Sequence, residues 1–181
     1  MPRIVDLTLE LLTAQGFAPF GAVISAAGAP AFTAGAMETW RAPFEVDGPM
    51  QMTLCRFHRQ PMEFSQLERH LAVTQGFLPL GGTDCVMVVA PPTDTTDRTD
   101  APAPETVRAF RMSGGQGVVL WRGTWHALAR FPVDAPHVDI VLLTGRDTQA
   151  EIERANYAPA AMQLTHLVDY AERDIGFRVS S

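Results

Sequence analysis

The amino-acid sequence predicts an all-β fold of the barrel or sandwich type, with a few short helices. Short apolar runs recur at intervals of about ten residues, and glycine-rich turns separate them. The length of 181 residues suits one domain with a single sizeable core. Apolar residues make up 46% of the chain and charged residues 19%, which is close to the average for globular domains.

The N-terminal third is expected to contain one helix and two strands. Thr8–Gln15 can form a short helix, which Gly16 would end. Phe20–Ile24 is typical of a first strand, and residues 25–36 form a small-residue loop or loose hairpin. Met52–His58 is expected to be the next strand.

The middle of the chain is expected to be strands joined by turns. Gln75–Leu80 and Cys85–Ala90 are two apolar runs separated by Gly81–Asp84, a pattern typical of a hairpin. Residues 91–104 are rich in Pro, Thr and Asp and predict a solvated loop rather than a domain linker. Further strands are expected at Thr106–Met112, Gly117–Trp121 and Val138–Thr144.

Near the C-terminus the pattern changes to a helical one. Thr148 and Glu151 fit a capping box that opens a helix ending near Asn156, and Met162–Asp174 could hold another helix. We therefore expect one domain over residues 1–181, with a core at about 17–146 and a helical C-terminal extension over 147–181.

The charged residues exclude several classes of function. The net charge is −6, and all 14 basic residues are arginine, so a lysine Schiff base or P-loop lysine is excluded. A codon bias toward GC-rich triplets suffices to explain the missing lysines. The acidic balance argues against a nucleic-acid partner. The sequence contains no run of 18 apolar residues, so no membrane span is predicted. The two cysteines, Cys55 and Cys85, are expected to be free thiols in a cytoplasmic protein.

Candidate site residues fall in two segments. The first runs from Leu67 to Gly82 and contains Glu68, His70 and Gln75; the second runs from Gly115 to His126. Residues two apart on a strand point to the same face, so a strand here would present Glu68 and His70 together and turn Arg69 away. Two imidazoles, a carboxylate and an amide oxygen suit a divalent transition metal better than calcium.

A helix is the competing interpretation of the first segment. Ser65 and Glu68 also fit a capping box, and Leu67, His70, Leu71 and Thr74 have helical spacing. Under that interpretation Glu68 and His70 would lie on a solvated surface.

Together, the two segments resemble the two motifs of the cupin superfamily. The first motif, His-x-His followed by Glu and Gly, is matched in spacing by Glu68, His70, Gln75 and Gly82. The second is matched by Gly115, Trp121, Gly123 and His126, with Trp in place of the usual Pro. The resemblance implies a cupin-like double-stranded β-helix, that is, a jelly-roll barrel.

Over about residues 5–145 the chain resembles more closely the bacterial ureidoglycolate lyases, historically named ureidoglycolate hydrolases. The matching segments are LERHLAVTQGFLPLGGTDCVMVVAPP and VRAFRMSGGQGVVLWRGTWHALARF, preceded by a Phe-x-x-Phe-Gly strand at Phe17–Ile24. Two departures are visible. Ala127 stands where some relatives have a second histidine, and the stretch from about Ala150 is longer than the family predicts.

The resemblance implies an enzyme that eliminates urea from (S)-ureidoglycolate to give glyoxylate, late in purine and allantoin breakdown. It implies one divalent metal of nickel, manganese, zinc or iron type and no organic cofactor. The implied ligands are Glu68, His70, Gln75 and His126, and the implied catalytic residues are Glu68, His70 and His126. Without a metal, His70 or His126 would act as the base and Glu68 would orient it.

The substrate carboxylate requires a cationic partner, which here must be an arginine. The candidates are Arg56 and Arg59, with Arg108 a weaker one; Gln75 and Trp125 are expected to contact the substrate as well. A homodimer is expected by analogy with cupins of this size. The alternatives are another cupin enzyme, such as a ureidoglycine aminohydrolase, a sugar isomerase or a dioxygenase, and a non-catalytic cupin that binds a small acid.

Overall fold

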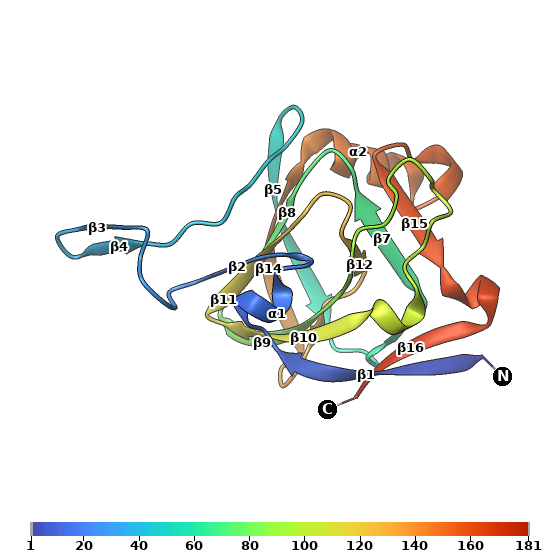
Figure 1. The fold of residues 1–181 in the computed structure, drawn as a ribbon, viewed down its shortest axis with the longest axis horizontal. Helices are drawn as coiled ribbons and strands as arrows, with labels where there is room; N and C mark the ends of the chain where they lie inside the picture. The colour runs from blue at the N-terminus through green and yellow to red at the C-terminus, as the bar shows by residue number, and fades with distance from the viewer. Residues whose placement is uncertain (1, 181) are drawn as a thin grey trace.

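The computed structural model describes residues 2–180 and is mostly β, built from two sheets that curl around a common core (Figure 1). The larger sheet has the order β15-β7-β12-β9-β10-β1-β16-β6, with β13 paired to β9. Its strands are β1 (Arg3–Leu11), β6 (Glu63–Phe64), β7 (Gln66–His70), β9 (Gly82–Ala90), β10 (Arg108–Gly114), β12 (Trp125–Ala127), β13 (Phe131–Pro132), β15 (Thr165–Asp169) and β16 (Ile175–Ser180).

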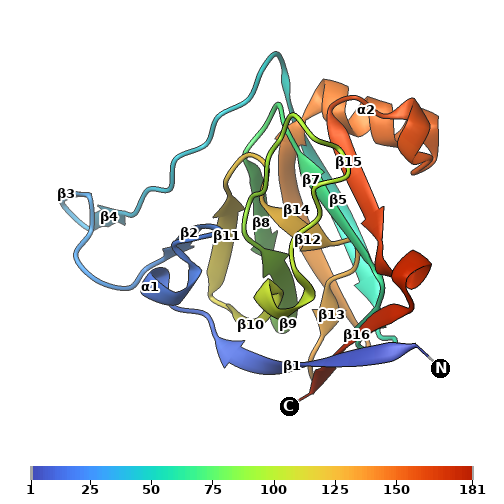
Figure 2. The same ribbon diagram turned by 45° about the vertical axis from the view of Figure 1, so that its right-hand side comes forward.

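The smaller sheet has the order β2-β11-β8-β14-β5. Its strands are β2 (Gly21–Ser25), β5 (Met50–His58), β8 (Gln75–Pro79), β11 (Gln116–Leu120) and β14 (His137–Gly145). A separate pair, β3 (Phe32–Ala34) and β4 (Met37–Thr39), forms an arm that projects away from the two sheets (Figures 1 and 2). The helices are short: α1 (Ala14–Phe17), α2 (Arg146–Ala155) and the 3-10 turns Pro104–Thr106, Pro159–Ala161 and Tyr170–Arg173.

The predicted all-β fold class is confirmed by this two-sheet architecture. The expected strands at residues 20–24, 52–58, 106–112, 117–121 and 138–144 all correspond to strands of the structure within a few residues. The arm formed by β3 and β4 agrees with the loose hairpin expected over 25–36. No helix between residues 2 and 180 is both long and apolar enough to cross a membrane.

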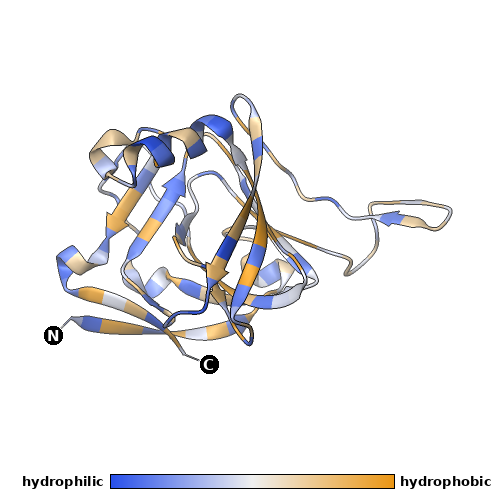
Figure 3. Ribbon diagram, turned by 180° about the vertical axis from the view of Figure 1, so that it is seen from behind, coloured by the Kyte–Doolittle hydropathy of each residue, from blue (hydrophilic) through white to orange (hydrophobic). Residues whose placement is uncertain are grey.

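The apolar run in strand β9 packs its two faces into different hydrophobic clusters. Cys85, Met87 and Val89 pack into the cluster between the two sheets, whereas Val86 and Val88 pack into a second cluster on the opposite face. Alternate residues of a strand point to opposite faces, so a strand covered on both sides is apolar throughout. Strands with one solvated face instead alternate in hydropathy, which Figure 3 shows as alternating bands.

Three local predictions are wrong, each because of a distant partner. In the segment expected as a helix at 8–15, residues 8–11 belong to strand β1, which pairs in parallel with both β10 and β16; the helix is confined to Ala14–Phe17. The runs at 75–80 and 85–90 are strands but not a hairpin, because β8 belongs to the smaller sheet and β9 to the larger one. The tail expected as a helix at 162–174 contains strand β15, which pairs with β7.

The C-terminal extension is therefore only partly helical. Helix α2 lies where a helix was expected, but Gly145 occupies its N-cap and no side chain caps it. The capping box predicted from Thr148 and Glu151 is wrong. The Glu151 carboxylate instead accepts hydrogen bonds from the backbone N–H groups of residues 163–165, at 2.6 to 3.1 Å, and so anchors the start of β15 to α2.

Candidate metal centre and active site

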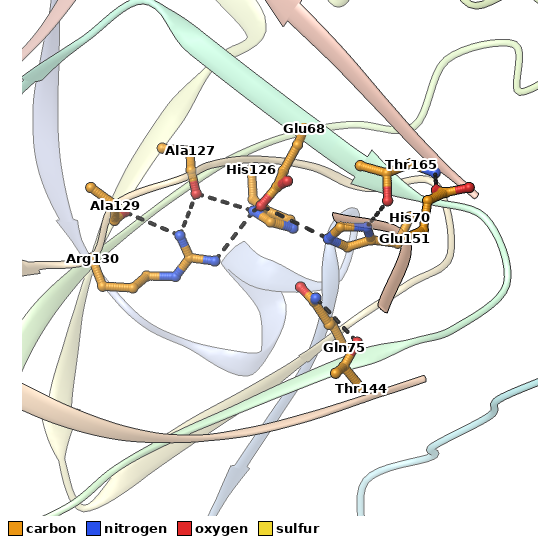
Figure 4. Close-up of polar contacts among 10 residues, drawn as sticks. All are labelled: Glu68, His70, Gln75, His126, Ala127, Ala129, Arg130, Thr144, Glu151 and Thr165. Carbon is orange, nitrogen blue, oxygen red and sulfur yellow. Dashed lines mark hydrogen bonds and ion pairs between the residues drawn. The ribbon is translucent and has the colours of Figure 1, made fainter. Parts of the chain in front are cut away.

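A cluster of buried polar side chains lies at one end of the core between the sheets (Figure 4). Glu68 and His70 come from β7, Gln75 from β8 and His126 from β12, and none is more than 5% exposed. The helix considered as the alternative for residues 65–74 is excluded, since Gln66–His70 is a strand. Strand alternation directs Glu68 and His70 to one face, as predicted.

Pairing between strands brings His126 to the same place. In the β12–β7 ladder His126 lies directly opposite Glu68. One ligand atom from each of Glu68, His70 and His126 lies within 4.8 Å of the others. Glu68 Oε1 is 3.9 Å from His70 Nε2 and 3.8 Å from His126 Nδ1, and the two imidazole centroids are 5.2 Å apart. Gln75 reaches toward this group from β8 (Figure 4).

Each predicted ligand has one buried polar atom without a hydrogen-bond partner: Glu68 Oε2, His70 Nε2, Gln75 Oε1 and His126 Nε2. Buried polar atoms are almost always paired, so four unpaired acceptors in one place are unusual. All four can donate a lone pair to a cation. Imidazole nitrogens together with carboxylate and amide oxygens suit a divalent transition metal, so these residues fit the implied metal.

Neighbouring groups orient the imidazoles. His70 Nδ1 lies 3.0 Å from Thr165 Oγ1, and His126 Nδ1 lies 3.1 Å from the Ala127 carbonyl oxygen. A carbonyl oxygen only accepts, so a proton on Nδ1 would be donated to it and would leave the lone pair on Nε2. Arg130 Nη2, 3.2 Å from the same Nδ1, only donates and favours the other tautomer. The amide of Gln75 is held in a similar way, because its Nε2 donates to Thr144 Oγ1 at 3.4 Å and leaves Oε1 unpaired.

Burial changes the acidity of these groups. Loss of solvation raises the pKa of Glu68 to about 7 and lowers the pKa of His70 to about 3. The pKa of His126 falls well below its ordinary value, first because of burial and second because of the nearby Arg130 charge. Both imidazoles are therefore neutral near pH 7, the state in which they bind metals or accept protons.

The cluster opens into a cavity of about 290 Å³. Glu68, Gln75 and His126 line it together with Arg130, which no sequence motif singled out. Helix α2 and the residues after it contribute another wall, which includes Tyr157. The segment from residue 147 onward, which was expected to be an appended extension, thus forms part of the cavity.

The structure places the arginines expected to bind substrate at different distances from the cavity and pairs each of them within the protein. Arg56 lies at the cavity wall, but its guanidinium is bound to Asp139 through two contacts of 2.7 Å. Arg59 donates to the Val133 carbonyl oxygen and is not among the residues that line the cavity. Arg108 is bound to Glu10.

Trp125 also lies outside the cavity lining, because it precedes His126 on β12 and so points to the opposite face. There its ring stacks on Arg69, whose Cζ is 4.5 Å from the ring centroid. Arg69 is turned away from Glu68 and His70, as expected, and donates to the carbonyl oxygens of Thr93, Asp94 and Asp97. The loop over 91–104 is largely exposed, as predicted, and these contacts tie it to the sheet.

Comparison with known proteins agrees with the resemblance. The model of the family described as "Ureidoglycolate lyase" matches residues 4–164. The chain belongs to this family. Among its relatives, the ureidoglycolate lyases of Stutzerimonas stutzeri and Azotobacter vinelandii are 39% and 37% identical over 129 residues. Those alignments cover 66% of this chain and 72% and 74% of the relatives.

A similar solved structure is RmlC from Streptococcus suis in complex with dTDP-D-xylose. It has 9% sequence identity and a TM-score of 0.37, and the alignment covers 73% of this chain and 61% of that one.

Proposed function

We propose that this chain is a ureidoglycolate lyase, which converts (S)-ureidoglycolate to glyoxylate and urea. The observation that carries the proposal is the joint presence of family membership and four unpaired, inward-facing acceptors on Glu68, His70, Gln75 and His126. A protein that only bound a small acid would not need these buried groups beside a cavity, and burying them unpaired costs stability.

The reaction is an elimination. The substrate's hydroxyl loses its proton as the carbon–oxygen double bond forms, the carbon–nitrogen bond breaks, and a proton is added to the departing urea nitrogen. The substrate loses one proton from its hydroxyl and the departing urea gains one, so no oxidant or second reactant is required.

Glu68 is the group best suited to move this proton. When no metal is bound, its pKa of about 7 would let the carboxylate accept a proton and return it near neutral pH, whereas a divalent metal held by Glu68 would lower that pKa. Its two oxygens allow one to face the histidines and the other to face the substrate hydroxyl. His70 and His126 stay neutral, and Thr165 and the Ala127 carbonyl hold their rings in place.

We propose that one divalent metal of nickel, manganese, zinc or iron type is held by Glu68, His70, Gln75 and His126. When bound, such an ion supplies positive charge that stabilises the developing alkoxide. The elimination places no demand on an organic cofactor. We also propose a homodimer located in the cytoplasm; the free thiols of Cys55 and Cys85 are compatible with that location.

The test is urea and glyoxylate release by the purified protein, with its metal content measured. His126→Gln is expected to lower the turnover number about a hundredfold or more, while the circular dichroism spectrum is unchanged. His58→Gln is the matched control, because His58 is an exposed histidine on β5 outside the cavity lining. Ammonia in place of urea would indicate a hydrolase, and release of neither product would refute the proposal.

A further inference from the structure

The guanidinium of Arg130 is buried in the wall of the candidate active site. Arg130 is 1% exposed and lines the cavity with Glu68, Gln75 and His126. Burial lowers its pKa to about 10, so it still carries a full positive charge near pH 7. The only other cationic side chain on the cavity wall, among residues 2–180, is Arg56, which Asp139 neutralises.

One end of this guanidinium is fixed by the protein. Nη1 donates to the carbonyl oxygens of Ala127 and Ala129, the second at 3.1 Å. The group also lies over the Phe77 ring, with Cζ 4.2 Å from the ring centroid. These contacts set the plane of the guanidinium and restrict its rotation.

On the opposite edge, made by Nε and Nη2, one N–H group of each nitrogen lacks an acceptor. Nε is buried and without a hydrogen-bond partner. Nη2 lies 3.2 Å from His126 Nδ1. Nη2 carries two N–H groups, so this single contact leaves one of them without a partner. Both donors of this edge are therefore available to a ligand.

The same edge binds carboxylates elsewhere in this chain. Arg56 Nε and Nη2 donate to the two oxygens of Asp139, and Arg108 Nε and Nη2 donate to the two oxygens of Glu10. The fork geometry of arginine matches a carboxylate in this way. An edge of the same kind that is not fully paired, on a residue that lines the cavity, is complementary to a carboxylate of a small molecule.

We propose that Arg130 binds the substrate carboxylate through Nε and Nη2 and so determines the specificity of the enzyme for 2-hydroxy acids that carry a ureido group. This inference rests on the proposed function. It favours Arg130 over Arg56 and Arg59, because Asp139 already binds both Nε and Nη2 of Arg56, and Arg59 is not among the residues that line the cavity.

The test compares two substrates that differ only in the carboxylate. Ureidoglycolate carries it, and N-(hydroxymethyl)urea lacks it but can undergo the same elimination, to formaldehyde and urea. Arg130→Lys and Arg130→Gln are expected to lower kcat/KM for ureidoglycolate on the order of a hundredfold. Turnover of N-(hydroxymethyl)urea should change less than about threefold, since that substrate makes no such contact.

Arg108→Lys is the matched control, since Arg108 also stacks on a phenylalanine ring and uses the same guanidinium edge for a carboxylate. It should leave kcat/KM unchanged for both substrates. Equal losses on both substrates in the Arg130 variants would assign Arg130 a structural role and overturn the inference. Circular dichroism and metal content verify that the variants fold.

Two measurements separate this inference from the proposed function and do not depend on active variants. In the wild-type protein alone, kcat/KM should favour ureidoglycolate over N-(hydroxymethyl)urea by about a hundredfold, and equal values would overturn the role of Arg130. If wild type releases no urea from either substrate, the proposed function fails. Calorimetric binding of glyoxylate then still tests Arg130: it should weaken at least tenfold in Arg130→Gln, and unchanged binding would refute the inference.

Discussion

Replacing Glu151 by Gln should destabilise the protein, because this carboxylate joins helix α2 to strand β15. Glu151 is 8% exposed, and its two oxygens accept four contacts from the N–H groups of Gln163, Leu164 and Thr165. In the variant, an NH₂ group replaces one accepting oxygen and faces an N–H donor. The remaining contacts lose the assistance of the negative charge.

The expected loss in the free energy of unfolding is about 2 kcal/mol. A hydrogen bond to a charged group contributes about 1.5–3 kcal/mol, and the exposed Gln163 N–H can recover part of that loss from water. For a chain of this length, about 2 kcal/mol corresponds to a fall in Tm of about 4–8 °C. Urea denaturation monitored by circular dichroism measures the change, and the denaturant slope should stay constant.

Glu153→Gln is the control, since Glu153 is exposed on the same helix and accepts a hydrogen bond from Gln149. Its effect should stay within about 0.5 kcal/mol. If Glu151→Gln costs no more than this control, the four backbone contacts do not contribute to stability and the reasoning is refuted.

Thr165→Val should lower metal affinity about 10–100-fold, because the hydroxyl beside His70 Nδ1 is lost while the side-chain shape changes little. Competition with a chelator measures the affinity, and an unchanged value would contradict this role. Below pH 6.5 the unfolded chain protonates His166, whereas burial and the Arg69 charge keep the folded pKa at about 4. The contribution of His166 to the free energy of unfolding is therefore complete above pH 6.5 and is lost as the pH falls toward 4. The urea midpoint of the wild type should exceed that of His166→Asn at pH 7.5, and this difference should become smaller at pH 5. A constant difference would count against that assignment. Gly21→Ala places a Cβ 2.2 Å from the Val119 carbonyl oxygen and should cost several kcal/mol, seen as a large drop in Tm; a normal Tm would show that the strand can shift.

Much of the candidate metal centre could be predicted from the sequence because its geometry is partly local. Glu68 and His70 are two apart on one strand, so they share a face once that segment is β. The local sequence alone was equally compatible with a helix at 65–74. The joint match with the segment that ends at His126 decided for the strand, since two motifs with conserved spacing are hard to meet by chance.

Other features depended on contacts between distant segments. Residues 8–15 were expected to form a helix, yet pairing with β10 and β16, about a hundred or more residues away, makes residues 8–11 part of a strand. The turn at 81–84 resembles a hairpin turn, but the strands on either side do not pair with each other. Strand β8 pairs with β11 and β14, and β9 pairs with β10 and β12. Sequence periodicity depends only on residues close together in the chain, so it carries no information about which distant strands pair.

The sequence by itself determined the β-rich fold and the requirement that a cationic substrate clamp be an arginine, and it predicted the ligand set Glu68, His70, Gln75 and His126. It could not say which of 14 arginines serves the site. That choice depends on which guanidinium groups already have acceptors, and only the folded chain pairs Arg56 with Asp139 and leaves an edge of Arg130 open. The physical reason is that strand alternation is a property of consecutive residues, whereas hydrogen-bond satisfaction is a property of the whole tertiary structure.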